Sequence, residues 1–471
     1  MKRTKLRFAA PLAALGLVIA ACAGDADEPA ASPEPAPAPE AEAESNPWDD
    51  LAEDDYLGRA LAGAYEGRSV SVFGSERSEV EAGAFNDTLA LFREATGINA
   101  VYTGSADFEP QLNVMIQGNN PPDMALIPQP GGVIGFAEDG SIQAVPAAVV
   151  ERTNAQFPAG TNDPYVYEGS TYALRYKTDL KSILWYNNAI FADNGYEIPD
   201  TWDGLKELSA TMIEDGITPW CVGIESGGAT GWPFTDWMEE MVLRLADENV
   251  YDQWTAGEVT FSDPRMVEIA QEILDVWNTD GMVYAAGGSI AATPFGDNAS
   301  PLVNGDCAMH RQAQFFASFF DDAGGTIGPD GDVGVAYFPA GGDGRTPVLT
   351  AGNSVAAFRD APEVWALMSW LTDAEGQEAR QSAQAARAAA ASGPGAASGF
   401  MSSNINLDPS VFNPVEQTWY ETLANASPAR FDASDLMTPE RNRAFWDEGT
   451  AAVNGDKSVA DAFAAIDAAA S

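Results

Sequence analysis

Residues 69–127 decide the fold class, and they read SVSVFGSERSEVEAGAFNDTLALFREATGINAVYTGSADFEPQLNVMIQGNNPPDMALI. The alternation of polar and apolar residues at 69–73 predicts a strand that ends at Gly74. Residues 80–95 place Phe85, Leu89 and Phe92 on one helix face, and Gly97 follows the helix. A second strand at 98–102, a helix at 109–117 and a third strand at 122–127 complete the pattern. Right-handed crossovers between such strands predict a parallel sheet and therefore the α/β class.

The rest of the chain continues this alternation. It predicts strands at 172–176, 183–186, 333–338 and 348–350, and helices at 202–212, 237–246, 264–279 and 362–391. Thr201 is the expected N-cap of the helix that starts at 202. With 471 residues, 45% of them hydrophobic, the chain can build a large core and is long enough for two lobes.

The charge balance narrows the range of partners. The chain has 24 Lys and Arg against 70 Asp and Glu, which gives a formal net charge of −46. Nucleic acid is excluded as a partner because phosphate binding needs a basic surface, and general attraction to anionic lipid is excluded for the same reason.

Signatures of catalysis are missing from the sequence. It contains no G-x-S-x-G, Walker, H-E-x-x-H or G-x-G-x-x-G motif. The single histidine, His310, excludes multi-histidine metal sites and is interpreted as a hydrogen-bonded structural residue. We therefore expect no catalytic residues, no metal site and no cofactor.

The N-terminus has the pattern of a bacterial lipoprotein signal. Four basic residues precede a short apolar run at 8–21, and Ile19-Ala-Ala-Cys22 resembles a lipobox, which makes Cys22 the expected lipidation site. The alternative is an ordinary signal peptide with a chance cysteine. Residues 22–60 are rich in Ala, Pro and acidic residues and predict an extended tether, with ordered structure from about Tyr65 onward. No later stretch is long and apolar enough for a membrane helix.

The two remaining cysteines, Cys221 and Cys307, are expected to pair in a disulfide because exported chains fold in an oxidising environment. Two buried thiols are the alternative. Cleavage of the signal would bring the net charge to about −50, and only four lysines would remain. Such an acidic surface is typical of proteins that work in strong salt, and a merely acidic protein is the alternative.

A tryptophan-rich turn gives the first candidate ligand contacts. Gly227-Gly-Ala-Thr-Gly-Trp-Pro-Phe-Thr-Asp-Trp237 sets Trp232, Asp236 and Trp237 behind glycines that allow close backbone approach. An indole can stack on the C–H face of a sugar while a carboxylate accepts its hydroxyl hydrogen bonds. The alternative is that both tryptophans fill the core at a helix start.

Polar loops after the first three predicted strands give further candidates. In open parallel sheets, ligands lie beyond the C-terminal ends of the strands. The expected contacts at this edge are Glu76, Arg77, Asp107, Phe108 and Gln129.

The ordered series of motifs resembles the extracellular solute-binding proteins of bacterial sugar-importing ABC transporters, and is most similar to the α-glucoside and maltose-binding type. The resemblance runs from about Ser69 to the C-terminus and rests on these stretches: Phe92-Arg-Glu-Ala-Thr-Gly97, Gly104-Ser-Ala-Asp-Phe-Glu109, Pro122-Asp123, Lys181-Ser-Ile-Leu-Trp-Tyr-Asn187, Pro199-Asp-Thr-Trp202, Gly231-Trp-Pro-Phe-Thr-Asp-Trp237, Asn304-Gly-Asp-Cys-Ala-Met309, Phe431-Asp-Ala-Ser-Asp-Leu-Met437 and Ala444-Phe-Trp446.

The resemblance implies a two-lobed, type II binding-protein fold, with a parallel-rich sheet in each lobe, a multi-strand hinge and a ligand cleft between the lobes. It implies lobe 1 at 66–180 plus 346–395 and lobe 2 at 181–345 plus 396–471. Carried onto this sequence, the family's cleft positions add Lys181, Arg311, Gln312, Phe315, Gly352 and Asn353. Phe315 departs from the pattern, since related proteins can carry tryptophan there.

The function implied is that of a receptor. It would capture a mono- or oligosaccharide, with an α-glucoside as the first candidate, outside the cell, and deliver it to membrane permease subunits. The expected protein is a monomer held at the membrane by its lipid anchor alone. A secreted glycosidase with an Asp/Glu pair and a receptor for a polyamine or peptide remain the alternatives.

Overall fold

The computed structural model describes residues 46–469, and of these residues 47–469 belong to one compact unit. The predicted signal peptide and Cys22 lie outside the described residues. Among the described residues, no helix is both long enough and apolar enough to cross a membrane.

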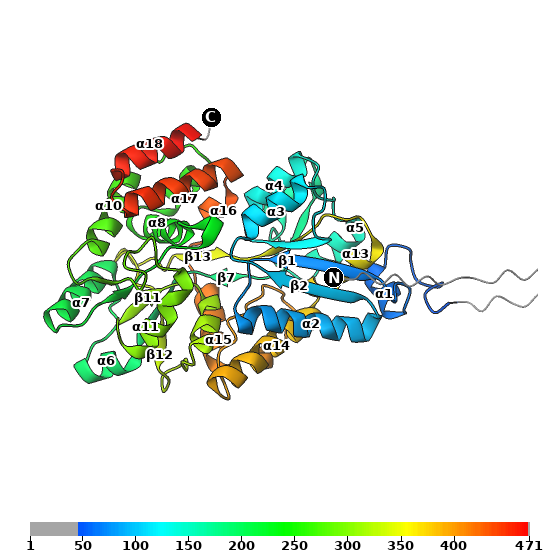
Figure 1. The fold of residues 1–471 in the computed structure, drawn as a ribbon, viewed down its shortest axis with the longest axis horizontal. Helices are drawn as coiled ribbons and strands as arrows, with labels where there is room; N and C mark the ends of the chain where they lie inside the picture. Colours follow the sequence, from blue (N-terminus) through cyan, green and yellow to red (C-terminus); the bar gives the residue numbers. More distant parts are fainter. Residues whose placement is uncertain (1–45, 470–471) are drawn as a thin grey trace, which may run out of the picture. The chain divides into compact units, whose positions relative to one another are not determined.

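Lobe 1 is built on a five-stranded sheet in the order β2-β1-β3-β14-β6. Strands β1 and β2 of this sheet are labelled in Figure 1. β1 pairs in parallel with β2 and β3, and β14 pairs antiparallel with β3 and β6. The strands are β1 Ser69–Gly74, β2 Asn99–Gly104, β3 Met124–Ile127, β6 Ala173–Arg175 and β14 Ser354–Ala357, and the small hairpin is β4 Val166–Tyr167 with β5 Ser170–Thr171.

Helices pack on both faces of this sheet and bury their apolar sides. Phe85, Leu89 and Phe92 of α2 are fully buried, as their spacing predicts, and Gly97 caps the helix with φ +70°. α2 and α14 lie side by side (Figure 1). The helices of this lobe are α1 Tyr56–Leu61, α2 Glu79–Thr96, α3 Phe108–Gln117, α4 Pro130–Glu138, α5 Ala147–Asn154, η1 Asp163–Tyr165, α13 Pro362–Thr372 and α14 Ala374–Ser392.

Lobe 2 repeats the plan with a sheet in the order β10-β9-β11-β8-β12. Its strands are β8 Ile183–Asn187, β9 Trp220–Cys221, β10 Val283–Tyr284, β11 Met309–Arg311 and β12 Val333–Tyr337. Its helices are α6 Asn188–Asn194, α7 Trp202–Glu214, η2 Gly227–Ala229, α8 Trp232–Leu245, α9 Glu248–Thr255, α10 Pro264–Trp277, η3 Phe295–Asn298, α11 Ala299–Asn304, η4 Gln314–Phe316, α12 Ala317–Asp322, η5 Pro409–Val411, α15 Pro414–Ala424, α16 Ala433–Leu436, α17 Pro439–Val453 and α18 Val459–Ala469.

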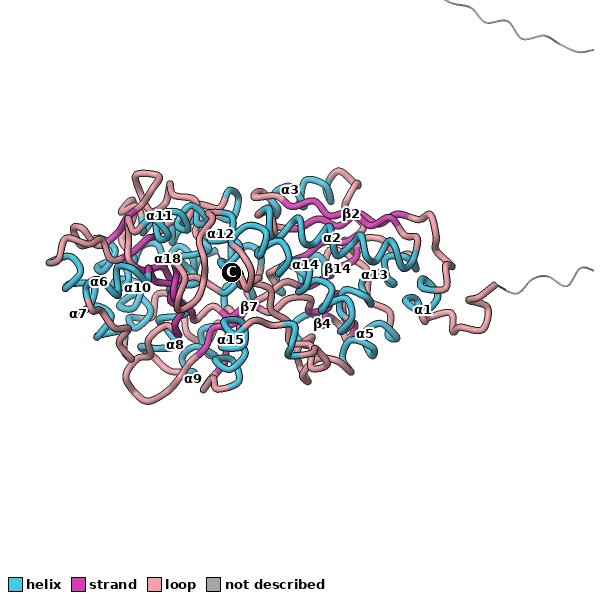
Figure 2. The backbone as a smooth tube through the Cα atoms, turned by 90° about the horizontal axis from the view of Figure 1, so that it is seen from below, coloured by secondary structure: helices cyan, strands magenta, loops and turns pink. Residues whose placement is uncertain are grey.

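A third, three-stranded sheet joins the lobes. It has the order β15-β13-β7, with β7 Asp179–Leu180, β13 Val348–Ala351 and β15 Ala429–Phe431. The chain passes from lobe 1 to lobe 2 through β7 and returns through β13, and β7 lies between the helices of the two lobes (Figure 2). The two-lobed α/β fold is thereby confirmed.

Three expectations need correction. Ordered structure starts before Tyr65, because α1 buries Leu57 and Ala60 against α13. The helical region at 362–391 is two helices, since Asp373 is extended and caps α14. Each large sheet is mixed and not parallel-rich, because two of its four pairings are antiparallel.

Cys221 and Cys307 are joined in a disulfide, the pairing expected from the sequence, with Cα atoms 5.5 Å apart. His310 lies beside it with Nδ1 2.9 Å from the Cys221 carbonyl oxygen. Burial lowers the pKa of His310 to about 4, so the ring is neutral at physiological pH. These contacts place His310 in the core of lobe 2, away from the cleft described below.

Candidate functional site

A polar cavity lies between the two lobes and beside the hinge, and its volume is about 130 Å³. Loops after β1, β2 and β3 supply one side of it, and α8, η3, η4, α12 and the segments around α16 and α17 supply the other. Its lining comprises Ser75, Glu76, Arg77, Glu81, Ala106, Glu109, Pro128, Gln129, Lys177, Asp179, Lys181, Ser226, Ala229, Trp232, Thr235, Asp236, Phe295, Phe315, Phe319, Ala351, Gly352, Asn353, Asp432, Ser434, Asp435 and Trp446.

The lobe 1 side of the cavity is organised by Lys177. Its Nζ lies 3.1 Å from Glu76 Oε1 and 3.5 Å from Glu81 Oε1, and Arg380 donates to Glu76 from behind. Burial alone would raise the pKa of Glu76, but Lys177 and Arg380 hold it below its ordinary value. Burial raises the pKa of Glu81 to about 7. One carboxylate is thus firmly ionised and its neighbour holds a proton near neutral pH.

Two backbone features hold this group in place. Gly352 has φ +144°, and a Cβ there would lie 1.9 Å from the Lys177 carbonyl oxygen, so only glycine fits the turn. The next residue, Asn353, accepts backbone hydrogen bonds from Tyr176 and Lys177. The 352–353 turn therefore fixes the segment that carries Lys177.

The lobe 2 side is organised by Lys181. Its Nζ donates to Asp236 Oδ1 at 2.7 Å and to Asp432 Oδ2, and it is almost wholly buried. Arg311 pairs with the other oxygen of Asp236 at 3.3 Å. Burial would lower the pKa of Lys181, but the two carboxylates raise it well above its ordinary value.

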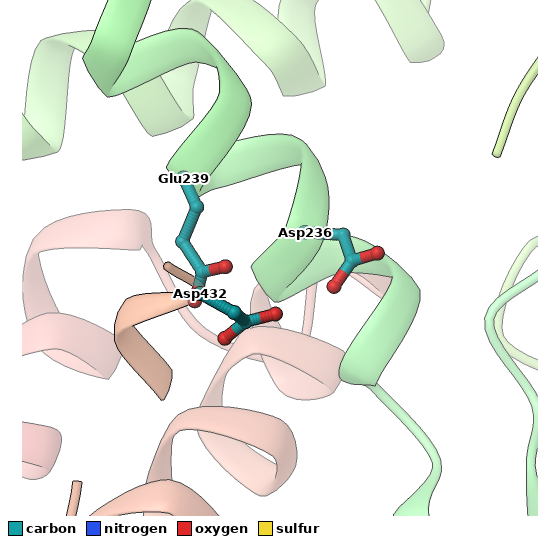
Figure 3. Close-up of side chains that lie close together, drawn as sticks. All are labelled: Asp236, Glu239 and Asp432. Atoms are coloured by element: carbon teal, nitrogen blue, oxygen red, sulfur yellow. The ribbon is translucent and has the colours of Figure 1, made fainter. Parts of the chain in front are cut away.

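Three carboxylates gather around this lysine. Asp236 and Glu239 project from α8 and Asp432 from the segment before α16, with one oxygen of each within 4.8 Å of the others (Figure 3). Burial raises the pKa of Asp236 to about 6 and that of Glu239 well above its ordinary value, which favours a neutral Glu239. The ammonium of Lys181 supplies the cation that balances Asp236 and Asp432, so the cluster is an internal ion-pair network.

Aromatic rings cover another part of the lobe 2 side, namely those of Trp232, Phe295, Phe315, Phe319 and Trp446. The Trp232 and Phe295 rings are 4.9 Å apart. The Arg77 guanidinium lies 5.0 Å from the centre of the Phe295 ring, and Lys177 Nζ lies 5.3 Å from that of Phe315. The aromatic side of the cavity can stack on the apolar face of a ligand ring. The polar side can form hydrogen bonds with the hydroxyl groups at the edge of the same ring.

Most of the residues that the sequence singled out line this cavity. They are Glu76, Arg77, Gln129, Lys181, Trp232, Asp236, Phe315, Gly352 and Asn353.

The other five do not line it. Phe108 packs on Phe73 in the lobe 1 core, and Trp237 lies in the lobe 2 core, 5.4 Å from the Trp220 ring. Arg311 is buried behind Asp236, where it is a positioning residue, and Gln312 bonds the backbone N–H of Ala313. Asp107 is exposed at the rim.

Sequence reasoning missed a second set of lining residues: Glu81, Glu109, Lys177, Asp179, Phe295, Asp432, Asp435 and Trp446. The scarcity of lysine in so acidic a chain could have marked Lys177 as a residue with specific carboxylate partners. Asp432, Asp435 and Trp446 lie within the motifs at 431–437 and 444–446 that carry the family resemblance. Glu109 likewise lies in the motif at 104–109, whereas no sequence pattern marked Glu81, Asp179 or Phe295.

Comparison with known proteins gives a consistent result. The family model described as bacterial extracellular solute-binding protein matches residues 75–378. The osmoprotective compounds-binding protein GgtB of Synechocystis is 34% identical over 377 residues, 78% of this chain and 83% of that protein. The alpha-glucosides-binding periplasmic protein AglE of Rhizobium meliloti is 33% identical over 415 residues, 85% of this chain and 86% of that protein.

Solved structures share the fold at lower identity. The bacterial solute receptor AcbH superposes with a TM-score of 0.71 at 14% identity, over 85% of this chain and 97% of that one. Maltose-bound MalE3 of T. maritima gives 0.66 at 18% identity, over 85% and 98%. On the family match, the identity to full-length relatives and the shared two-lobed architecture, this chain belongs to the bacterial extracellular solute-binding proteins.

Proposed function

We propose that this protein is the receptor of an ABC importer that captures a mono- or oligosaccharide, with an α-glucoside as the first candidate, and delivers it to the permease. The observation that carries the proposal is the pairing, in one cleft, of an aromatic wall with buried polar side chains. A pyranose presents an apolar C–H face and a ring of hydroxyls, which match these two surfaces.

The charge arrangement favours an uncharged ligand. Lys177 and Lys181 are both held by carboxylates at 3.1 Å and 2.7 Å, so neither is available to balance an anionic ligand. Glu76, Asp236 and Asp432 are held by the same cations, which removes them as counter-ions for a polyamine. Paired groups can still accept from and donate to hydroxyls.

The relatives support the same substrate class. AglE is described as binding alpha-glucosides and GgtB as binding osmoprotective compounds, and the first description matches the sugar proposed here. We propose that the protein only binds and does not catalyse, because carboxylates already committed to lysines and arginines are poor acid–base pairs.

The remaining parts of the chain fit this role. We propose that residues 1–21 are a signal peptide and that Cys22 is lipidated. The tether expected at 22–60 is proposed to end before Tyr56, where α1 begins, and to hold a monomeric receptor at the outside of the membrane. We propose lobes at 66–180 plus 346–395 and at 181–345 plus 396–471, with α1 packed on the first lobe as an addition to it. The net charge of −46 supports a surface adapted to salt. A melting temperature that does not rise between low salt and molar KCl would refute this last point.

A thermal-shift and calorimetry screen tests the receptor proposal. The Cys22→Ser chain without its signal would be screened against maltose, trehalose, sucrose, spermidine and a tripeptide. Binding to the native state raises the melting temperature by mass action. We expect a rise with at least one α-glucoside and no release of p-nitrophenol from p-nitrophenyl α-glucoside. A rise with spermidine or the peptide alone would refute the sugar assignment, and turnover would refute the receptor role.

A further inference from the structure

Contacts between the lobes flank the cavity on three sides. The first joins η2 of lobe 2 to the start of α3 in lobe 1. A Cβ on Gly227 would lie 2.5 Å from Asp107 Oδ1, and one on Gly228 would lie 2.7 Å from the Pro110 ring. The neighbouring residues Ala229 and Ala106 line the cavity, so the contact closes this end of it.

The second contact joins α12 of lobe 2 to the N-terminus of α2 in lobe 1. Asp322 Oδ2 accepts from the backbone N–H of Glu79 at 3.3 Å. Phe319 of α12 and Glu81 of α2 line the cavity, and they are close along the chain to Asp322 and Glu79. The contact therefore closes a second end.

The third contact joins α4 of lobe 1 to the segment between α16 and α17 of lobe 2. A Cβ on Gly131 would lie 1.7 Å from the Met437 carbonyl oxygen, and one on Gly135 would lie 3.2 Å from Pro439 Cγ. The cavity residues Gln129 and Ser434 are close along the chain to this contact. The remaining side is the hinge, represented by Ala351 and Gly352.

From these contacts we propose that the closed receptor encloses its ligand and takes a sugar of one or two rings, while longer oligosaccharides are excluded. The inference rests on the proposed sugar-binding function and adds a size limit to it. The cavity volume of about 130 Å³ is below the range of about 300–1,000 Å³ that is usual for small-molecule pockets, so the space between the lobes suits a short ligand. A longer chain would have to pass through one of the three contacts and hold the lobes apart. The closed state would then lose the close approach between the lobes that the glycines allow.

The test is an affinity series by isothermal calorimetry on the Cys22→Ser chain. The short probes are methyl α-glucoside, maltose, trehalose and sucrose, and the long probes are maltotetraose and stachyose. The tightest short probe is expected to bind at least about tenfold more strongly than either tetrasaccharide. A tetrasaccharide that binds as tightly as the best short sugar overturns the size limit and leaves the receptor function standing. If no sugar binds, the proposed function fails and the size limit fails with it.

Gly228→Ala tests the closing contact directly. Its φ lies outside the left-handed region, so the added methyl acts through its clash with Pro110. Because the methyl resists closure, the best short sugar should bind about fivefold or more weakly, with the melting temperature of the unliganded chain unchanged. Gly132→Ala is the matched control, since a Cβ there meets only Gln129 Cβ at 3.6 Å, and its affinity should stay within about twofold. Unchanged short-sugar affinity in a folded Gly228→Ala variant overturns the inference.

Discussion

Lys181→Met should destabilise the protein strongly at neutral pH. The substitution keeps an unbranched side chain of similar length but removes the ammonium that lies 2.7 Å from Asp236 Oδ1 and also contacts Asp432. Both carboxylates are about 1% exposed, so water cannot replace the lost partner. Asp236 keeps Arg311 at 3.3 Å, whereas Asp432 loses its cation.

The expected cost follows from the single buried charge that is left without a partner. Breaking a buried ion pair by removing one member costs about 3–5 kcal/mol, because the other member stays desolvated. In the wild type, burial would raise the pKa of Asp432, but Lys181 holds it below its ordinary value. Its contribution to stability is therefore present above the unfolded pKa near 4 and is lost as the pH falls through the lower folded pKa.

Without Lys181, burial raises the pKa of Asp432. Above pH 4 the folded variant must then keep a buried, unpaired charge or bind a proton, and either one lowers its stability relative to the unfolded chain. The stability gap between wild type and Lys181→Met should consequently widen from pH 4 to pH 7. Urea unfolding followed by tryptophan fluorescence at pH 4 and pH 7 measures this gap.

The double variant Lys181→Met/Asp432→Asn is the control. It removes the unpaired charge, and Asn can keep the hydrogen bond from the Asp435 N–H that caps α16. We expect it to regain at least half of the lost free energy. A loss below about 1 kcal/mol for Lys181→Met, a gap that does not change with pH, or a double variant no more stable than the single one would refute the reasoning.

Three further predictions follow from other contacts. Trp232→Ala should weaken binding of the best sugar by about 10–100-fold through lost stacking with little change in melting temperature, as calorimetry can test; an unchanged affinity would place the ligand elsewhere. Cys221→Ser/Cys307→Ser should lower the free energy of unfolding by up to about 4.5 kcal/mol, because the disulfide closes a loop with a sequence separation of 86, and equal urea midpoints would contradict this. Burial raises the pKa of Asp321 to about 7. The folded state thus holds a proton that the unfolded state releases near pH 4, so Asp321→Asn should be increasingly more stable than wild type from pH 4 to pH 7, by up to about 2–4 kcal/mol, and a parallel pH profile for the two proteins would count against it.

Local patterns in the sequence predicted the elements well where one face of an element is buried. The residues Phe85, Leu89 and Phe92 repeat at helical spacing, and all three are buried in α2. The same patterns were silent on α1, whose single buried turn depends on α13, three hundred residues away in the chain.

The tryptophan-rich turn shows what a pattern alone leaves open. Trp232 and Asp236 are four residues apart on α8, so they share one face, and that face lines the cavity. Trp237 is on a different face and packs against Trp220 and Trp277. The sequence made both tryptophans candidate ligand contacts. Only the orientation of α8 in the fold shows that Trp232 faces the cavity and Trp237 faces the core.

The sequence by itself determined the α/β class and the loops that reach the cleft from lobe 1, because strand ends and helix caps are set by neighbouring residues. Only the tertiary structure brought Lys181 between Asp236 and Asp432, which are 55 and 251 residues away from it. It also showed that the glycines at 227, 228 and 131 meet the opposite lobe. Such contacts depend on how the two lobes pack across the hinge. No local sequence pattern predicts which residues of one lobe will meet the other.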